Sequence, residues 1–370
     1  MKVIHILDEL KFSGAEVMYV AAAKVFQGFG CDLSVVATNR KLGDYASFFE
    51  NAGYQVFHKP LLKFPVKKWG YYIRFIHFLK KNRYDIMHIH VNLWGMAFCA
   101  WVAGCRSVYT FHSVFYSRKI TRWYYRWQRW STRKIFRCTF QTIGDSVYEQ
   151  EKTYWHNDSI KIYNWYDSNR YFPAHEGEKE TVRTSLNIGK DVLVLISVGS
   201  CRKLKRHSDI IRAVSIVVNK YPNMLYLHLG EGEMLEEEKK LVETLQLADH
   251  VRFCGNQMDV RKYLIASDIY LMTSRVEGVS ITAIEVMACN IPTVFYDVPG
   301  LRDFNHEQEC NCLVREDTVQ LAEKIISLYE NSDKQKTLTT NARKLIDLNF
   351  NMQKNAIQIF NLYKNISVNQ

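Results

Sequence analysis

The 370-residue sequence lacks several features that would place it in a specialised class of protein. It has no apolar run of about 18 residues or more, so it offers no segment typical of a transmembrane helix. It has no low-complexity run and no obvious internal repeat, which argues against extensive disorder and against a repeat protein. The opening MKVIHILDEL has a short apolar run, two acids and no small-residue cleavage site, which is not typical of a signal peptide. We therefore expect a cytoplasmic protein.

The cysteines lack the pattern of a disulfide framework. There are nine of them, an odd number, and most lie inside apolar runs. This usage is typical of buried free thiols in a reducing compartment. Only Cys310 and Cys312 are close in sequence, and no second pair lies near enough to suggest a zinc site. We therefore expect no metal and no resident cofactor.

What the sequence has instead is an alternation of short apolar segments with helical patterns. Such segments in alternation predict parallel sheets covered on both faces. The expected strands are Lys2–Leu7, Cys31–Ala37, Tyr54–His58, Ile86–His90, Ser107–Phe111, Cys138–Ile143, Val192–Val198, Leu225–Leu229, Val251–Cys254, Ile269–Met272 and Thr293–Phe295. The polar stretch Tyr163–Lys190 interrupts the rhythm and is interpreted as a linker. The chain is therefore expected to form two α/β units, with a binding site beyond the carboxyl ends of the strands.

One segment in the second half suits phosphate binding. Glu277 follows a predicted strand, and Glu285 lies about two turns into the next helix. The residues that open this helix, Gly278, Val279, Ser280 and Ile281, have free backbone N–H groups, and the helix dipole attracts phosphate there. A carboxylate further along suits ribose hydroxyls. A helix merely capped by Ser280, with an ordinary glutamate at 285, is equally compatible with the residues alone.

This segment resembles the E-x7-E signature of the retaining GT-B glycosyltransferases, in particular glycosyltransferase family 4, which includes many bacterial polysaccharide enzymes. Further motifs resemble those of the family, in the family's order, over roughly residues 1–315. They are Ser13–Glu16 (SGAE), Asp85–His90 (DIMHIH), Thr110–Ser113 (TFHS), Ile162–Asp167 (IYNWYD) with Phe172-Pro173, Val198–His207 (VGSCRKLKRH), Leu229–Gly232 (LGEG), Val251–Gly255, Ala266–Asp268, Pro292 and Asn311. The ordered set is more specific than any one motif in it.

The resemblance implies an α/β fold of the GT-B type, in which two Rossmann-like domains with parallel sheets face each other across a cleft. It implies an acceptor-binding domain over residues 1–165 and a nucleotide-sugar-binding domain over 166–345. The last segment, 346–370, would form a C-terminal helix that crosses back to the first domain.

The resemblance also implies roles for single residues. As catalytic residues, His112 would contact the transferred sugar near the reacting carbon, Glu277 would bind the sugar ring, and Lys205 would neutralise the leaving diphosphate. The donor-binding residues would be Gly14, Gly199, Arg202, Lys205, Gly278, Val279, Ser280, Ile281 and Glu285. Structural interpretations stay open: Gly14 as a helix-entry glycine, Lys205 as a solvated lysine and His112 as a buried structural histidine.

The sequence departs from the family pattern at several positions. Ser13 and Trp165 each stand where the family has glycine, and Cys312 replaces the glycine of an Asn-Gly pair. The arginine that usually follows the glycine after the first strand of the second domain is Ser200 here. Arg202, two residues further on, is the candidate replacement.

A strongly basic segment occupies Phe115–Arg137 in a chain whose formal net charge is +11. No acid occurs between Ile86 and Gly144, and aromatic residues alternate with the basic ones. This combination is typical of a helix on an anionic membrane surface, although it also suits nucleic acid or a solvated helix packed on the domain core. Since the segment follows His112, we favour contact with a membrane or a lipid-linked acceptor. The residues concerned are Arg118, Lys119, Arg122, Trp123, Arg126, Trp127, Arg129 and Trp130.

The expected function is therefore retaining, metal-independent transfer of a sugar from a UDP- or GDP-sugar to a glycan acceptor. The expected acceptor is a lipid-linked intermediate of capsular, exopolysaccharide or O-antigen synthesis, handled at the inner face of the cell membrane. Two alternatives remain: a nucleotide-sugar epimerase on the same fold, and a non-catalytic basic protein that binds membrane or nucleic acid. A dinucleotide-dependent dehydrogenase is disfavoured, because no G-x-G-x-x-G follows the first strand.

Overall fold

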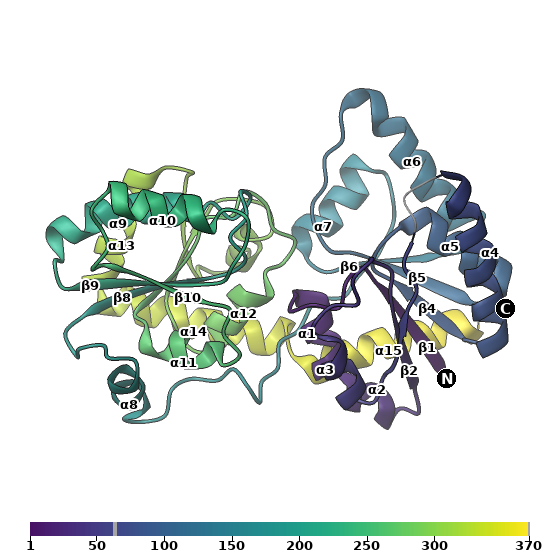
Figure 1. Ribbon diagram of the computed structural model, residues 1–370, viewed down its shortest axis with the longest axis horizontal. Coiled ribbons are helices and arrows are strands. Elements are labelled where there is room, and N and C mark those ends of the chain that lie inside the picture. Colours follow the sequence, from purple (N-terminus) through teal and green to yellow (C-terminus); the bar gives the residue numbers. More distant parts are fainter. Residues whose placement is uncertain (62–64, 369–370) are drawn as a thin grey trace. The chain divides into compact units, whose positions relative to one another are not determined.

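The structure, a computed structural model, describes residues 1–61 and 65–368, and the side chains of residues 65–68 lie outside the description. The chain divides into two compact units. The N-terminal unit comprises Met1–Trp165 together with Met352–Gln370, and the C-terminal unit comprises Tyr166–Asn351. Each unit is a parallel sheet covered by helices on both faces (Figure 1).

The N-terminal sheet has the strand order β3-β2-β1-β4-β5-β6-β7, and every pair is parallel. Its strands are β1 (Lys2–Leu7), β2 (Asp32–Ala37), β3 (Gln55–His58), β4 (Ile86–Ile89), β5 (Arg106–Phe111), β6 (Thr139–Thr142) and β7 (Ile160–Lys161). The central strands are apolar on both faces, as a sheet covered by two helical layers requires. In β1, for example, only Lys2 is exposed.

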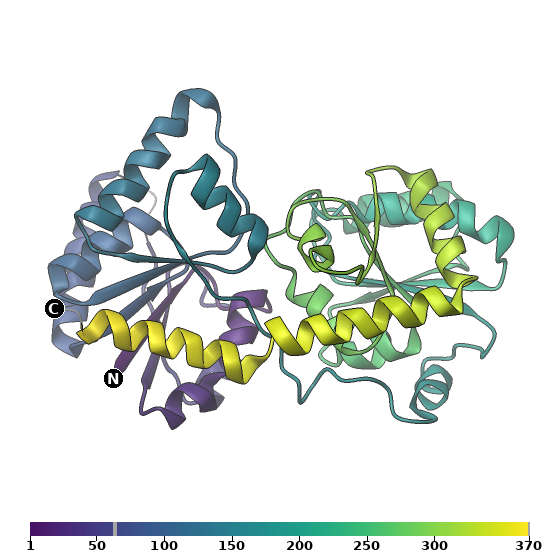
Figure 2. The same ribbon diagram turned by 180° about the vertical axis from the view of Figure 1, so that it is seen from behind.

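The helices of this unit lie on opposite faces of the sheet. On one face α4 packs against α5 and α5 against α6, whereas on the other α15 packs against α2 (Figures 1 and 2). The helices are α1 (Gly14–Ala21), α2 (Ala23–Gly28), α3 (Ala46–Asn51), α4 (Pro65–Asn82), α5 (Leu93–Ala103), α6 (Lys119–Lys134), α7 (Asp145–Glu149), the π-helical turn Gln150–Tyr154, and α15 (Met352–Val368). The C-terminal helix therefore belongs to the core of the N-terminal unit.

The C-terminal sheet has the order β10-β9-β8-β11-β12-β13. Its strands are β8 (Leu193–Val198), β9 (Met224–Leu229), β10 (Val251–Gly255), β11 (Ile269–Met272), β12 (Thr293–Tyr296) and β13 (Cys312–Val314). Its helices are α8 (Glu178–Ser185), α9 (His207–Lys220), α10 (Leu235–Thr244), α11 (Val260–Ala266), α12 (Ile281–Ala288), α13 (Thr318–Tyr329) and α14 (Ser332–Asn349), with a 3-10 turn at Arg302–Asn305.

In both sheets, strands are added on one side of the unit's first strand and then on its other side, so the strand order changes direction there. In the N-terminal unit the switch lies between β1 and β4, and in the C-terminal unit between β8 and β11. In open α/β sheets, ligands bind outside the carboxyl ends of the strands at such a switch point. The functional residues should therefore follow these strands. Among the described residues, no helix combines the length and the apolar character needed to cross a bilayer.

The structure corrects several expected elements. The polar stretch Tyr163–Lys190 contains helix α8, whose sequence EKETVRTS is too short and polar to show a helical apolar period. Helix α5 was also missed, because LWGMAFCAWVA is apolar on nearly all sides and has no polar face to reveal its period. The two short edge strands β7 and β13 were missed as well.

Candidate functional site

The loops after β8 and β11 are joined at the switch point of the C-terminal sheet. The Thr273 hydroxyl, directly after β11, lies 3.0 Å from the carbonyl oxygens of both Lys205 and Arg206. The backbone N–H of Arg275 donates to the carbonyl of Leu204 at 2.9 Å. These bonds hold the loop that carries Lys205 against the loop that carries Glu277.

Lys205 and Glu277 form an ion pair at this junction. The Lys205 Nζ lies 2.6 Å from Oε1 of Glu277, and both side chains are largely buried. The arrangement brings together two of the residues to which the family resemblance assigns a catalytic role, although 72 positions separate them in the chain. Because an ammonium has three donors, Lys205 can contact an anion while it keeps its bond to Glu277.

Helix α12 begins immediately after this ion pair. The Ser280 side chain caps the helix by accepting a hydrogen bond from the Ala283 N–H at 3.3 Å. Gly278 and Val279 precede the cap, and Ile281 is the first helical residue. The structure therefore places these four predicted donor residues at the positive end of a helix, where backbone N–H groups and the dipole attract phosphate.

Gly300 supports this helix entry and was missed in the sequence. It has φ +83°, and a Cβ there would collide with the backbone oxygens of Glu277 and Gly278. Only glycine lets the loop after β12 lie this close to the helix entry. The Pro299-Gly300 pair marks a turn in the sequence, but the sequence does not say what the turn packs against.

Glu285 is buried inside α12, and the Tyr171 hydroxyl donates a hydrogen bond to its carboxylate. Burial raises the pKa of Glu285 to about 8, and the opposing effects of Arg170 and of Tyr171 are smaller. A protonated carboxyl at this place can donate as well as accept, which suits a ligand hydroxyl.

The loop after β8 also contains Gly199 and Arg202. A Cβ at Gly230 would collide with the carbonyl of Gly199, so the LGEG turn packs directly on the end of β8. Arg202 is exposed and lines a cavity of about 510 Å³ beside α9 and α10, together with Arg206, Arg212 and Lys240. The cavity is therefore strongly basic.

In the N-terminal unit, a chain of buried imidazoles leads to His112, which follows β5. His112 Nε2 lies 2.9 Å from His90 Nδ1, and His90 Nε2 lies 3.2 Å from His5 Nδ1. Burial lowers the pKa of His112 to about 4 and that of His5 to about 3. His112 is therefore neutral near pH 7, and its neighbour His90 fixes the orientation of its ring. Gly14 opens α1 in the same unit.

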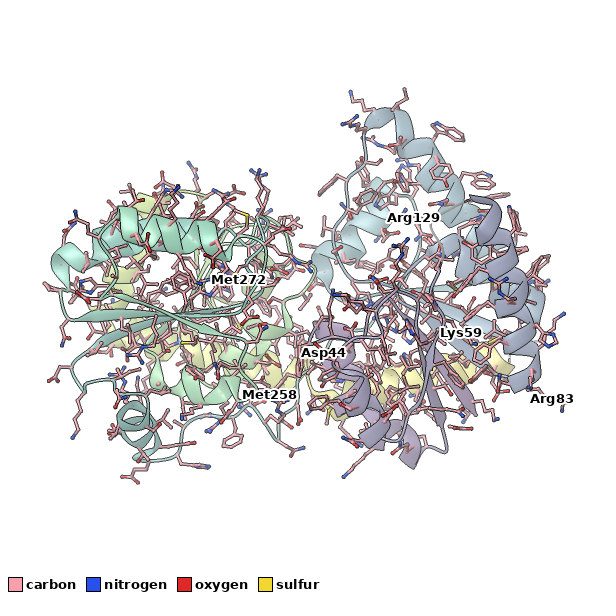
Figure 3. The ribbon with its side chains drawn as sticks, in the orientation of Figure 1. Asp44, Lys59, Arg83, Arg129, Met258 and Met272 are labelled. Carbon is pink, nitrogen blue, oxygen red and sulfur yellow. The ribbon has the colours of Figure 1, made fainter. Side chains whose placement is uncertain are left out.

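The basic segment forms helix α6, and one of its predicted surface residues is not at the surface. Arg129, labelled in Figure 3, belongs to α6. It is only 6% exposed and makes a bidentate pair with Glu151, with both N–O distances at 2.7 Å. Its guanidinium also lies over the rings of Phe111 and Trp155. Arg129 therefore cannot contact a membrane: it anchors α6 to the core, because its position on the helix faces inward.

The other predicted residues of this segment are at least partly accessible. Trp123 is 69% exposed, Trp130 54% and Trp127 44%, while Arg118 and Lys119 are exposed and Arg122 and Arg126 half-buried. Ile120, at 79%, and Tyr116, at 61%, extend the apolar surface. Large apolar side chains and cations are thus both accessible on α6 and in the segment before it, a combination typical of an interaction surface.

Two family profiles match the chain, one in each unit. "Glycosyltransferase Family 4" matches residues 12–151, and "Glycosyl transferases group 1" matches residues 178–345. Together they cover most of both Rossmann-like units, including the regions of His112, Lys205 and Glu277.

Two curated relatives and a solved structure are also similar to this chain. The UDP-Gal:alpha-D-GlcNAc-diphosphoundecaprenol alpha-1,3-galactosyltransferase of Escherichia coli is 25% identical over 319 residues, which cover 79% of this chain and 78% of that protein. The N-acetyl-alpha-D-glucosaminyl L-malate synthase of Bacillus anthracis is 26% identical over 210 residues, 56% of this chain and 54% of the relative, so that match spans about half of its length. The structure of Anabaena Alr3699/HepE with UDP-glucose superimposes with a TM-score of 0.84 at 18% identity, over 99% of this chain and 100% of that one.

The two parallel-sheet units and their switch-point loops define the architecture of a GT-B glycosyltransferase. Within that class, the paired profiles show that the chain belongs to the glycosyltransferases of the family 4 type.

Proposed function

We propose that this protein is a retaining glycosyltransferase that moves a sugar from a UDP- or GDP-sugar to a glycan acceptor. The observation that carries the proposal is the Lys205–Glu277 ion pair at the entry of α12, with Glu285 buried further along the same helix. A cation, a positive helix end and a carboxyl group in this order match the phosphates and the ribose of a nucleotide diphosphate.

Each group has a distinct task in the proposed reaction. The N–H groups at the start of α12 and the Lys205 ammonium stabilise the charge that develops on the leaving diphosphate. Glu285 holds the ribose, and Glu277 holds the sugar ring. In the N-terminal unit, neutral His112 contacts the sugar near the reacting carbon.

The chemistry we propose is same-face attack without a metal ion. The acceptor oxygen forms the new bond to the anomeric carbon while the bond to the diphosphate oxygen breaks. The acceptor proton passes to the departing phosphate, so no protein nucleophile is required.

For the acceptor, we propose a lipid-linked sugar handled at the cytoplasmic face of the membrane. The exposed tryptophans and cations of α6 form a surface suited to the interface of an anionic bilayer. The name of the E. coli relative specifies a sugar on diphosphoundecaprenol as the acceptor of that enzyme, which supports this acceptor class.

A thermal-shift screen with UDP, GDP, ADP and CDP tests the donor site. A ligand that binds only the folded state raises the melting temperature by mass action. We expect one diphosphate to stabilise the wild type and Glu285→Ala to lose that shift, whereas Glu323→Ala, an exposed glutamate on α13, keeps it. Sugars linked to the responding nucleotide then serve as donors, and the anomeric configuration of the product tests retention. Stabilisation by polyanions but by no diphosphate would overturn the proposal.

A further inference from the structure

A second cluster of chemically reactive side chains lies inside the C-terminal unit. Cys201, His207, His228 and Glu238 are between 0% and 4% exposed, and their potential ligand atoms all lie within 4.8 Å of one another. The four residues come from four places: the loop after β8, the first residue of α9, the penultimate residue of β9 and the first half of α10. None of them has a role in the proposed transfer reaction.

The distances fit a small cation. His228 Nε2 lies 3.0 Å from His207 Nδ1, 3.1 Å from a Glu238 oxygen and 3.7 Å from Cys201 Sγ. His207 Nδ1 lies 3.4 Å from the other Glu238 oxygen. Bond lengths of about 2.0–2.3 Å in a tetrahedral zinc site put neighbouring ligand atoms about 3.3–3.7 Å apart, close to these values.

Hydrogen bonds alone do not account for all the short contacts in this cluster. Three groups converge on the single atom Nε2 of His228, yet a neutral imidazole nitrogen carries at most one proton and directs it at one partner. The potential ligand atoms of the four residues instead surround one shared small volume, as the ligands of a cation do.

The charges also fit. A divalent cation bound to a cysteine thiolate, a glutamate carboxylate and two neutral imidazoles forms a centre with no net charge. Such a centre can be buried without the large penalty of an uncompensated ion.

We propose that Cys201, His207, His228 and Glu238 bind a structural zinc ion through Sγ, Nδ1, Nε2 and a carboxylate oxygen. Four protein ligands leave no open position, so the ion is structural and takes no part in bond making. It joins α9, β9 and α10 to the loop after β8. His207 and Glu238 also form part of the wall of the cavity of about 510 Å³ described above, so the cluster lies next to a space that opens to the surface.

The histidine cluster of the N-terminal unit does not meet the same criteria. His88 uses both ring nitrogens, with Tyr363 at 2.5 Å and Thr110 at 2.6 Å, and His90 uses both of its own with His5 and His112. Three neutral imidazoles would also leave the full charge of a divalent ion uncompensated. Of the two clusters that the described residues form, we therefore assign the metal to the C-terminal one.

The first test measures metal directly and does not depend on the proposed enzymatic activity. Wild-type protein expressed with zinc should contain about one zinc per chain by elemental analysis. Treatment with a chelator should lower its melting temperature, and added Zn²⁺ should restore it. Wild-type protein that takes up no zinc and shows no shift with Zn²⁺ would overturn the proposal.

The second test identifies the ligands. Cobalt(II) added to zinc-depleted wild type should give a thiolate-to-metal absorption band. This band by itself shows that a cysteine thiolate binds the metal. Cys201→Ser should abolish that band and weaken zinc binding by at least about 100-fold, more than the loss of a group that only supports a ligand. The matched control Cys254→Ser, which replaces a cysteine in β10 outside the cluster, should retain both. A band that persists in Cys201→Ser would place the metal elsewhere and refute the assignment.

Discussion

The two units share one order over six strands, to which the N-terminal sheet adds β7, but they carry different groups at their switch points. Beyond β4 and β5, the N-terminal unit presents neutral imidazoles, because burial lowers the pKa of His112 to about 4 and holds that of His90 well below its usual value. Beyond β8 and β11, the C-terminal unit presents the charged pair Lys205–Glu277. The same scaffold thus supports two chemistries, and the residues in the loops decide which of them each unit has.

The units also differ in how they use aromatic residues. All eight tryptophans of the chain belong to the N-terminal unit, and several of them are exposed on or near α6. We interpret this as a division of labour, with donor binding in one unit and acceptor or membrane binding in the other. It also means that tryptophan fluorescence follows the N-terminal unit separately.

The largest expected effect concerns Glu285 in the C-terminal unit. The pKa of Glu285 is about 8 in the folded protein, above the ordinary value of 4.5. The contribution of Glu285 to the free energy of unfolding is therefore complete below pH 4.5 and is lost as the pH rises through 8. Glu285→Gln has no titrating group at this position, so its free energy of unfolding should not depend on pH in this way. Above pH 8 the free energy of unfolding of the variant should exceed that of the wild type by up to about 5 kcal/mol. Unfolding followed by circular dichroism from pH 4.5 to 9 checks this, and parallel curves for the two proteins would refute it.

The next effect concerns the buried ion pair of the N-terminal unit. Glu151→Gln leaves the Arg129 charge buried without its partner, which should lower the free energy of unfolding by about 3–5 kcal/mol. Denaturation followed by tryptophan fluorescence measures it. Asp158→Asn, which removes the exposed partner of Arg133, is the matched control and should change little. If the two substitutions lower the free energy of unfolding equally, the buried Arg129–Glu151 pair is no more important for stability than the exposed Arg133–Asp158 pair.

A third prediction concerns the rate of sugar transfer and the position of Lys205 in the C-terminal unit. Lys205→Ala should lower the rate of sugar transfer about 100- to 1000-fold, because it removes a charge that stabilises the leaving diphosphate. Lys203→Ala, an exposed lysine in the same loop, should leave the rate nearly unchanged. If both variants lose activity equally, the general basicity of the loop, and not the position of Lys205, supports catalysis.

The smallest effect concerns α6. Each cation near an anionic membrane contributes about 1 kcal/mol, so Lys119→Ser should weaken binding to anionic vesicles about fivefold. Lys240→Ser, at an exposed position in the C-terminal unit, should leave binding unchanged. Vesicle flotation measures this, and a wild type that does not float with anionic vesicles would remove the proposed membrane contact.

Much of the framework followed from the sequence. The strand Lys2–Leu7 was predicted with its observed bounds, and Ile269–Met272 likewise, because an apolar run between polar turns has a strong local signal. The GT-B fold and its two Rossmann-like units are confirmed. Elements without a period, such as α5 and α8, were not predictable, because their local pattern has no contrast between faces.

The sequence by itself determined the alternation of strands and helices and the E-x7-E segment, because each depends on residues that are near one another in the chain. It also indicated the family, because the family's motifs follow one another in a fixed order along the chain. Only the tertiary structure decided that Lys205 pairs with Glu277, that Arg129 faces the core and binds Glu151, and that Gly300 supports the entry of α12. It also brought Cys201, His207, His228 and Glu238 together, whereas spacing alone drew attention to Cys310 and Cys312. These contacts join loops and helices that only the sheet order makes neighbours, and local patterns carry no information about such long-range pairing.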